Sequence, residues 1–253
     1  MFRRSVQKGR NQYMKSDDLV RAGKLDEAVD WLSGHLRDNP TDARARTALF
    51  ELLAFQGDYA RAEKHLTVLG EGAKDTVVGA LVYHGALHAE RIRREMFEKE
   101  TYPVPLPASS AELAGSINGR PFQSISDTDL RIGARLEVFG AGDYFWIPFR
   151  QIQTIVIQPP KRLRDLVWIP ARVTTAPGFQ QRELGEVLIP ALSPLTFRHP
   201  EAEVRLGRLT EWCADEQGRE HPYGLKMLSV NGEDFPILEI RRLEFQTESA
   251  ATA

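Results

Sequence analysis

Two copies of one pattern lie 34 residues apart, Gly-Lys-Leu-Asp-Glu-Ala at residues 23–28 and Gly-Asp-Tyr-Ala-Arg-Ala at residues 57–62. Glycine permits the close approach that a tight turn between two antiparallel helices needs, and the alanine that follows permits tight helix crossing. At the same offset Leu32 is followed by Leu66, which continues the apolar face of each helix one turn further. The N-terminal part of the chain is therefore predicted to be a helical repeat.

A period of 34 residues is that of the tetratricopeptide repeat, which this pattern resembles. Asn39-Pro40 closes the first unit where that repeat commonly places its proline. A third helix is predicted over residues 75–99, because apolar residues recur there on one face and would cap the stack. These apolar residues are Val78, Leu81, Val82, Ala89, Ile92 and Met96.

The composition is that of a soluble globular protein, with 42% hydrophobic and 27% charged residues. A net charge of −2 supplies no broad positive field for nucleic-acid binding. The single cysteine, Cys213, excludes an intramolecular disulfide and a thiolate cluster for zinc, which fits a reducing compartment. Because no stretch approaches the ~20 apolar residues of a membrane span, and no signal peptide is evident, we expect a cytoplasmic protein.

The chain is predicted to divide at a proline-rich segment. Residues 101–118 break any long helix and are interpreted as a linker, because they contain three prolines and end at Asn118 before a glycine. This places a repeat domain at residues 1–100, a second domain at residues 119–246 and a disordered tail at residues 247–253.

The second domain is predicted to contain a mainly antiparallel sheet, because its apolar residues recur with a period of two. Residues 135–149 indicate a hairpin around Gly140–Asp143, and residues 225–241 indicate another, whose Asn231-Gly232 turn is typical of a type I′ connection. Further strands are expected at residues 152–157, 167–175 and 183–189, with a helical turn at 161–165. The fold class is thus α+β, an α-helical repeat domain followed by a mixed domain.

Two blocks carry a family resemblance, Tyr-Phe-Trp-Ile-Pro-Phe at residues 144–149 and Arg-Asp-Leu-Val-Trp-Ile-Pro-Ala at residues 164–171. Further blocks in the same order are Gly-Arg-Pro-Phe at 119–122 and Thr-Glu-Trp at 210–212. Together they resemble the ImpE/TagJ family of type VI secretion accessory proteins. The motif residues to which we give a structural role are Trp146, Ile147, Pro148, Phe149, Asp165, Leu166, Trp168 and Pro170.

The resemblance implies a cytoplasmic accessory of the secretion apparatus, with no enzymatic activity and no cofactor. It implies a protein partner, the small subunit of the contractile sheath (TssB-like), bound through that subunit's N-terminal helix. We expect neither a nucleic acid nor a membrane as partner, and the oligomeric state stays open.

Short helical repeats bind partners on a concave face built from the first helix of each pair. An amphipathic helix in such a groove would gain affinity from apolar anchors and selectivity from the flanking charges. By repeat position, the predicted partner-binding residues are Tyr13, Asp17, Thr47, Glu51, Leu81 and His88.

Two pairs of residues leave a metal-dependent or small-molecule enzyme open as an alternative. His84 and His88 have the spacing of zinc-binding helices, although position 85 is glycine and a third ligand such as His221 or Glu90 would be needed. Asp127 and Asp129 could form a carboxylate pair, but side chains that bind backbone N–H groups at a turn explain them better. A repeat scaffold outside secretion is the other alternative.

The aromatic block Tyr144, Phe145, Trp146 and Phe149 could in principle stack on nucleic-acid bases. Both faces of this strand are apolar, however. That pattern favours a central strand of the sheet, covered on each side.

Overall fold

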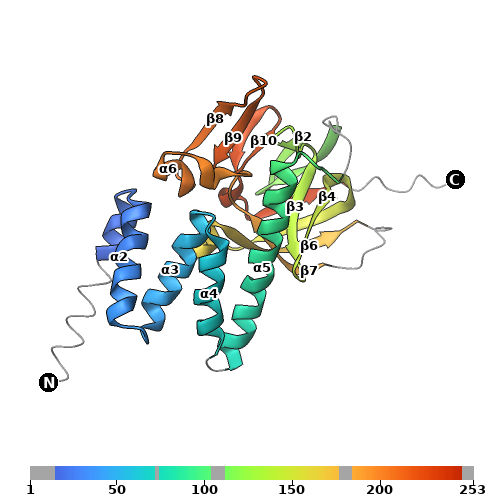
Figure 1. Cartoon of the computed structure of the whole chain (residues 1–253). Coiled ribbons are helices and arrows are strands. Elements are labelled where there is room, and N and C mark those ends of the chain that lie inside the picture. The colour runs from blue at the N-terminus through green and yellow to red at the C-terminus, as the bar shows by residue number, and fades with distance from the viewer. Residues whose placement is uncertain (1–14, 72–73, 104–111, 177–183, 247–253) are drawn as a thin grey trace.

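The computed structural model describes residues 15–71, 74–103, 112–176 and 184–246 (Figure 1). Helices occupy the N-terminal part of the described chain and strands the C-terminal part, as the α+β prediction required. The predicted tail at residues 247–253 and the predicted binding residue Tyr13 lie outside the described residues. None of the described helices is long and apolar enough to cross a membrane.

The N-terminal part of the described chain is a series of helices, as the repeat pattern predicts. Residues 15–21 are helical, and they are followed by α2 (Leu25–Asp38), α3 (Ala43–Phe55), α4 (Tyr59–Gly70) and α5 (Lys74–Glu98). Asp42 and Asp58 accept hydrogen bonds from backbone N–H groups of the first turns of α3 and α4, which satisfies donors that a helix start leaves free. Gly23 and Gly57 have φ of 72° and 67°, which confirms their predicted role in the turns.

Only two of the six residues on the apolar face predicted for α5 are buried. Ala89 and Met96 are packed, whereas Val78 and Leu81 are 65% and 72% exposed, and Val82 and Ile92 are exposed as well. Four of the residues predicted to cap the stack through this face, Val78, Leu81, Val82 and Ile92, are therefore exposed instead. Aromatic residues on a different side of α5, Tyr83 and Phe97, make the contacts with the second domain.

Ten strands form one sheet in the described part of the chain, and every pair of neighbours is antiparallel. The order across the sheet is β11-β10-β2-β1-β12-β5-β6-β7-β3-β4. The bounds are β1 Glu112–Ile117, β2 Arg120–Asp127, β3 Arg135–Gly140, β4 Asp143–Pro148, β5 Ile152–Ile157, β6 Trp168–Thr175, β7 Gly185–Pro190, β10 Met227–Val230, β11 Glu233–Pro236 and β12 Arg242–Phe245. A separate two-stranded sheet pairs β8 (Thr210–Ala214) with β9 (Glu220–Gly224).

Short helices connect the strands. They are η1 Phe149–Gln151, η2 Leu163–Leu166, η3 Thr196–Arg198, α6 Ala202–Arg205 and η4 Ile237–Glu239. The turn Asn231-Gly232 has positive φ at both residues, which confirms the type I′ signal. The strand predicted to run on to residue 241 instead ends at Pro236, because the chain turns into η4 there.

Two predictions about the sheet need correction. Strand β1 begins at Glu112, inside the segment interpreted as a linker, and it lies between β2 and β12. Strand β4, expected to be central, lies at the end of the sheet. Its two apolar faces have another cause, since Ile147 faces the core of the sheet while Trp146 packs against Phe97 of α5.

The sheet curls back on itself. Phe245 of β12 stacks on Phe149, the residue after β4, with ring centroids 5.5 Å apart, although four strands separate β12 from β4 in the sheet order. On its other side Phe245 meets Phe122 of β2 at 6.0 Å. The curled sheet therefore encloses its own apolar core.

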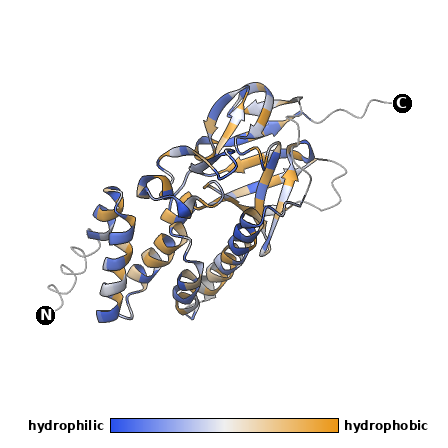
Figure 2. Ribbon diagram, turned by 45° about the horizontal axis from the view of Figure 1, so that its top comes forward, coloured by the Kyte–Doolittle hydropathy of each residue, from blue (hydrophilic) through white to orange (hydrophobic). Residues whose placement is uncertain are grey.

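A second core joins the repeats to the sheet. It combines buried residues of α2, α3 and α4 with Trp168, Leu188 and Leu192 of the second domain. Figure 2 shows the alternating polar and apolar sides of the helices and the apolar strands that make this possible. Since one core spans both parts, the repeats do not form an independently packed arm.

The segment that contains η3 and α6 holds both repeat turns. A Cβ atom added at Gly57 would lie 2.5 Å from Cγ of Phe197, and one at Gly23 would lie 2.0 Å from Oε1 of Glu203. Arg208 donates to the carbonyl oxygens of Val20 and Arg21 at the end of the first described helix, where backbone carbonyl groups need partners from outside the helix. The glycines therefore permit contact with the second domain as well as the turns themselves.

A buried ionic network connects α5 to the sheet. Arg93 of α5 donates two hydrogen bonds to the Glu137 carboxylate on β3, at 2.7 and 3.0 Å, and one to the Leu192 carbonyl oxygen. Lys226, just before β10, lies 2.6 Å from carboxylate oxygens of both Glu137 and Asp127. Each of these four ionic residues is at least nine-tenths buried.

The two carboxyl groups of this network respond to pH in opposite directions. Burial opposes ionisation of Glu137, but Arg93 and Lys226 outweigh it and lower the pKa of Glu137 to about 2. Burial raises the pKa of Asp127 to about 6, against the attraction of Lys226. The lowered pKa means that ionised Glu137 stabilises the folded protein, and this contribution is fully present above pH 4.5, the pKa of the group in the unfolded chain. The raised pKa of Asp127 has the opposite effect, since the free energy of unfolding falls as pH rises from 3.8 to about 6 and this carboxyl group ionises.

We predict that Glu137→Gln lowers the free energy of unfolding at neutral pH by roughly 3 kcal/mol, because Arg93 and Lys226 lose a shared buried counter-charge. The deficit should shrink as pH falls from 4.5 towards 2, where the wild-type carboxylate becomes protonated. Urea unfolding at neutral and acidic pH measures both effects. Glu95→Gln, at an exposed carboxylate paired with Lys99, should leave stability unchanged. A constant Glu137→Gln deficit across that pH range would contradict this account.

We also predict that Gly57→Ala destabilises the protein by about 2 kcal/mol more than Gly119→Ala. Both glycines have positive φ, but nothing lies within 4 Å of a Cβ at Gly119, whereas Phe197 occupies that space at Gly57. Chemical denaturation of the two variants makes the comparison. Equal losses would show that the backbone conformation alone requires glycine at residue 57.

Candidate protein-binding site

A groove of about 620 Å³ opens where three repeat helices meet the second domain. We call it the repeat groove. Its lining residues are Thr47, Phe50 and Glu51 of α3, Leu66 and Leu69 of α4, Gly79, Ala80 and Tyr83 of α5, and Arg162, Leu163 and Arg164 at η2.

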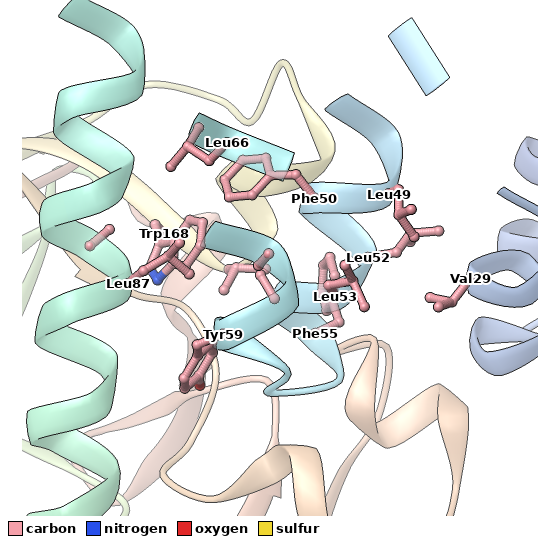
Figure 3. Close-up of a cluster of buried hydrophobic side chains, with 14 of the residues drawn as sticks. Val29, Leu49, Phe50, Leu52, Leu53, Phe55, Tyr59, Leu66, Leu87 and Trp168 are labelled. Carbon is pink, nitrogen blue, oxygen red and sulfur yellow. The ribbon is translucent and has the colours of Figure 1, made fainter. Parts of the chain in front are cut away.

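Phe50 and Tyr83 form an aromatic inner wall of the repeat groove, and the fully buried Trp168 packs behind them. Phe50 stacks on Trp168 with ring centroids 6.1 Å apart, and Tyr83 lies 6.0 Å from Phe50 and 5.7 Å from Trp168. Figure 3 shows Phe50 of α3 beside Leu66 of α4. It also shows Trp168 of β6 next to α5, near Leu87 of that helix. Trp168 is fixed further, because its indole N–H donates to the Glu90 carboxylate at 3.1 Å. The wall is therefore set before any ligand arrives.

An ion pair crosses from the repeats to η2 beside this wall. Arg164 lies 2.8 Å from the Glu51 carboxylate, and its guanidinium carbon is 4.7 Å from the centre of the Tyr83 ring. Burial raises the pKa of Glu51, and the nearby Arg164 opposes that rise. Arg164 is thus neutralised within the protein and contributes mainly planar surface to the groove.

Arg162 differs from Arg164, because it is exposed and no carboxylate in the described residues pairs with it. Its backbone is nevertheless held in place. The Asp165 carboxylate accepts hydrogen bonds from the N–H groups of Lys161 and Arg162, at 2.9 and 3.0 Å. The repeat groove therefore combines an apolar interior with one positive charge at its rim.

The predicted partner-binding residues do not form one surface. Thr47 and Glu51 line the repeat groove, but Glu51 is 7% exposed and paired with Arg164, so it does not fit the role of an exposed contact. Leu81 lines a different groove, between α5 and the β3–β4 hairpin. His88 and Asp17 are exposed and line neither groove.

The prediction from repeat position missed the residues of the repeat groove that α4, the start of α5 and the second domain contribute. Leu69 and Ala80 belong to helices whose helical period was visible in the sequence, but the pattern does not say which side of α4 and α5 stays open. Arg162 and Arg164 come from the second domain. Arg164 opens the motif block at residues 164–171 and Arg162 lies just before it, but neither was among the predicted binding residues.

The motif residues of the second domain lie in the core or beside it. Ile147, Phe149 and Trp168 are fully buried, and Asp165 shapes η2 as described above. The others occupy intermediate or surface positions. Trp146 and Leu166 are partly buried, Pro148 ends β4, and Pro170 is exposed on β6.

His84 and both aspartates have other partners, and His88 is exposed. His84 faces Glu63 at 3.6 Å, while Glu90 and His221, the possible third ligands, contact Trp168 and Asp215. Among the described residues no three His, Cys, Asp or Glu side chains converge as a metal site would require.

The aspartates have the turn-forming role that we favoured, together with ion pairs. Asp127 accepts the backbone N–H of Asp129 at 2.9 Å, and its other oxygen meets Lys226. Asp129 accepts the backbone N–H of Arg131 and pairs with the Arg131 guanidinium. Both carboxylates are therefore engaged within the fold.

Comparison with known proteins covers both parts of the chain. A family model described as ImpE protein matches residues 119–244, and a tetratricopeptide repeat model matches residues 19–82. The type VI secretion system accessory component TagJ of Pseudomonas aeruginosa PAO1 is 31% identical over 269 aligned residues. That alignment covers 94% of this chain and 93% of the relative.

A solved structure shares the fold. The crystal structure of protein VPA1032 from Vibrio parahaemolyticus superimposes with a TM-score of 0.78, covers 92% of this chain and 98% of that chain, and is 22% identical in sequence. Its likeness extends over the repeats and the sheet together.

Proposed function

The chain belongs to the ImpE/TagJ family, and on that premise we propose that it is a non-catalytic, protein-binding adaptor of a type VI secretion system. A relative named as an accessory component of that system aligns with nearly the whole chain, including the repeats. His84, Asp127 and Asp129 have partners within the fold, and no metal-binding cluster is found among the described residues, so no observation there supports the enzyme alternative.

We propose that the partner is an α-helix of the small subunit of the contractile sheath (TssB-like), and that the repeat groove receives it. The observation that supports this site is the fixed aromatic wall next to the apolar side chains of Leu66 and Leu69. An amphipathic helix could place apolar side chains there. An acidic residue on its flank would meet Arg162, the one rim cation that lacks a carboxylate among the described residues.

The partner is tested by mixing the purified protein with the purified small sheath subunit and with a peptide of that subunit's N-terminal helix. Co-elution on size exclusion and saturable calorimetric binding are the expected results. If the folded protein binds neither, the sheath assignment fails, and a scaffold outside secretion becomes the better explanation.

The site is tested by two neighbouring substitutions on α4. Leu69 lines the repeat groove, whereas Val68 is 46% exposed and does not line it. We predict that Leu69→Asp weakens helix binding at least about tenfold, because it places a charge among apolar side chains, while Val68→Asp leaves it unchanged. Calorimetric titration of both variants decides the site. Binding that is equal for the two variants would move the partner away from this groove and leave the adaptor proposal standing.

A further inference from the structure

One buried cation in the described chain lacks a counter-charge. The buried cationic side chains are Arg93, Arg135 and Lys226. Arg93 and Lys226 share the carboxylates of the network described above. Arg135 is 9% exposed, yet its side chain makes a single hydrogen bond, to the Ile132 carbonyl oxygen at 3.1 Å, and no ion pair with any described residue.

The surroundings of Arg135 stabilise a planar cation without neutralising it. Its guanidinium carbon lies 5.7 Å from the centre of the Trp146 ring. Burial lowers the pKa of Arg135, and no nearby carboxylate offsets that effect. No nitrogen atom of Arg135 is buried without a partner, so its remaining N–H groups face the groove that it lines and are available to an anionic ligand group.

Arg135 lines a groove of about 650 Å³ between α5 and β4, which we call the edge groove. Its other lining residues are Ile92, Glu95, Met96 and Lys99 of α5 and the residue after it, Thr101 and Pro103, and Tyr144, Phe145, Trp146 and Pro148 of β4. Glu95 and Lys99 pair with each other at the surface. The uncompensated charge of the groove is therefore that of Arg135.

The edge groove follows the outer edge of β4. Phe145 belongs to the core of the sheet, whereas Trp146 packs towards α5, so the groove touches side chains from both faces of the strand. Strand β4 is the last in the sheet order and pairs with β3 alone in the described chain.

The register shows which backbone groups of β4 are free. The two-residue turn makes Gly140 and Asp143 a hydrogen-bonded pair, so Phe145 and Ile147 also bond to β3. Tyr144 and Trp146 then direct their N–H and C=O groups outward, into the side that the groove occupies. An open strand edge of this kind is a template for one more strand.

We propose that the edge groove binds an extended acidic segment of a partner protein, which pairs with the outer edge of β4 and places a carboxylate on Arg135. The free N–H and C=O groups of Tyr144 and Trp146 supply the main-chain recognition. Ile92 and Met96 of α5 supply the apolar wall for alternate side chains of the bound strand. This site is separate from the repeat groove and does not depend on the sheath assignment.

The probe is a short, acetylated and amidated peptide of alternating threonine and valine with one central glutamate, compared with the same peptide carrying glutamine. The glutamate peptide should bind the full-length protein at least about tenfold more tightly in fluorescence anisotropy. Hydrogen exchange should slow at the amides of Tyr144 and Trp146 when it binds, because those groups become paired.

Two arginine variants locate the charge. Arg135→Gln should abolish the preference for glutamate over glutamine, while Arg150→Gln, at an exposed arginine just after β4, should keep it. Arg135→Lys keeps the positive charge and should show a reduced preference for the glutamate peptide. It replaces Arg135→Gln in the comparison if the glutamine variant does not fold. The comparison of the two peptides on the unmodified protein needs no variant.

Three results would overturn the proposal. They are equal affinity for the two peptides, absence of binding at millimolar peptide, and binding that leaves exchange at Tyr144 and Trp146 unchanged. A preference for glutamate that survives Arg135→Gln would also place the anion elsewhere.

Discussion

The buried pairing of Arg93 with Glu137 is the interaction on which the arrangement of this protein depends. Glu137 lies on β3, near one end of the sheet order, and it shares Lys226 with Asp127 of β2, near the other end. The same carboxylate thus holds the curled sheet closed and fixes α5 to it. Such a network is costly to build in a low-dielectric interior, so its stability requires every member to be present and correctly placed.

Fixing α5 determines how the repeats can be used. Trp168 packs against Phe50 of α3 and Tyr83 of α5, on faces that a free repeat array could offer to a partner. Arg164, also from the second domain, forms an ion pair with Glu51 of α3 beside it. The segment that contains η3 and α6 meanwhile covers both repeat turns. Much of the surface of the repeats is therefore in contact with the second domain, and the repeat groove at their margin is one of the surfaces that stay open.

Some features of this arrangement could be predicted from local patterns and others could not. The repeat turns, the β3–β4 hairpin and the bounds of β5 follow from glycines, apolar periodicity and turn residues. Strand β1 was missed because prolines and serines precede it. Strand β4 was misplaced because two apolar faces are typical both of a central strand and of an edge strand that a helix covers. Of the binding residues, Thr47 was placed on the groove, whereas Glu51 was expected at the surface and is buried.

The sequence by itself determined the repeat period, the α+β class and the family, because each is written in short-range spacing or in ordered blocks of residues. Only the tertiary structure decided which charges meet and which surfaces stay open. Arg93 and Glu137 are 44 residues apart, and Lys226 comes from near the end of the chain, so no local pattern could pair them. The same holds for Arg135, because only the folded chain shows that no described carboxylate forms an ion pair with it.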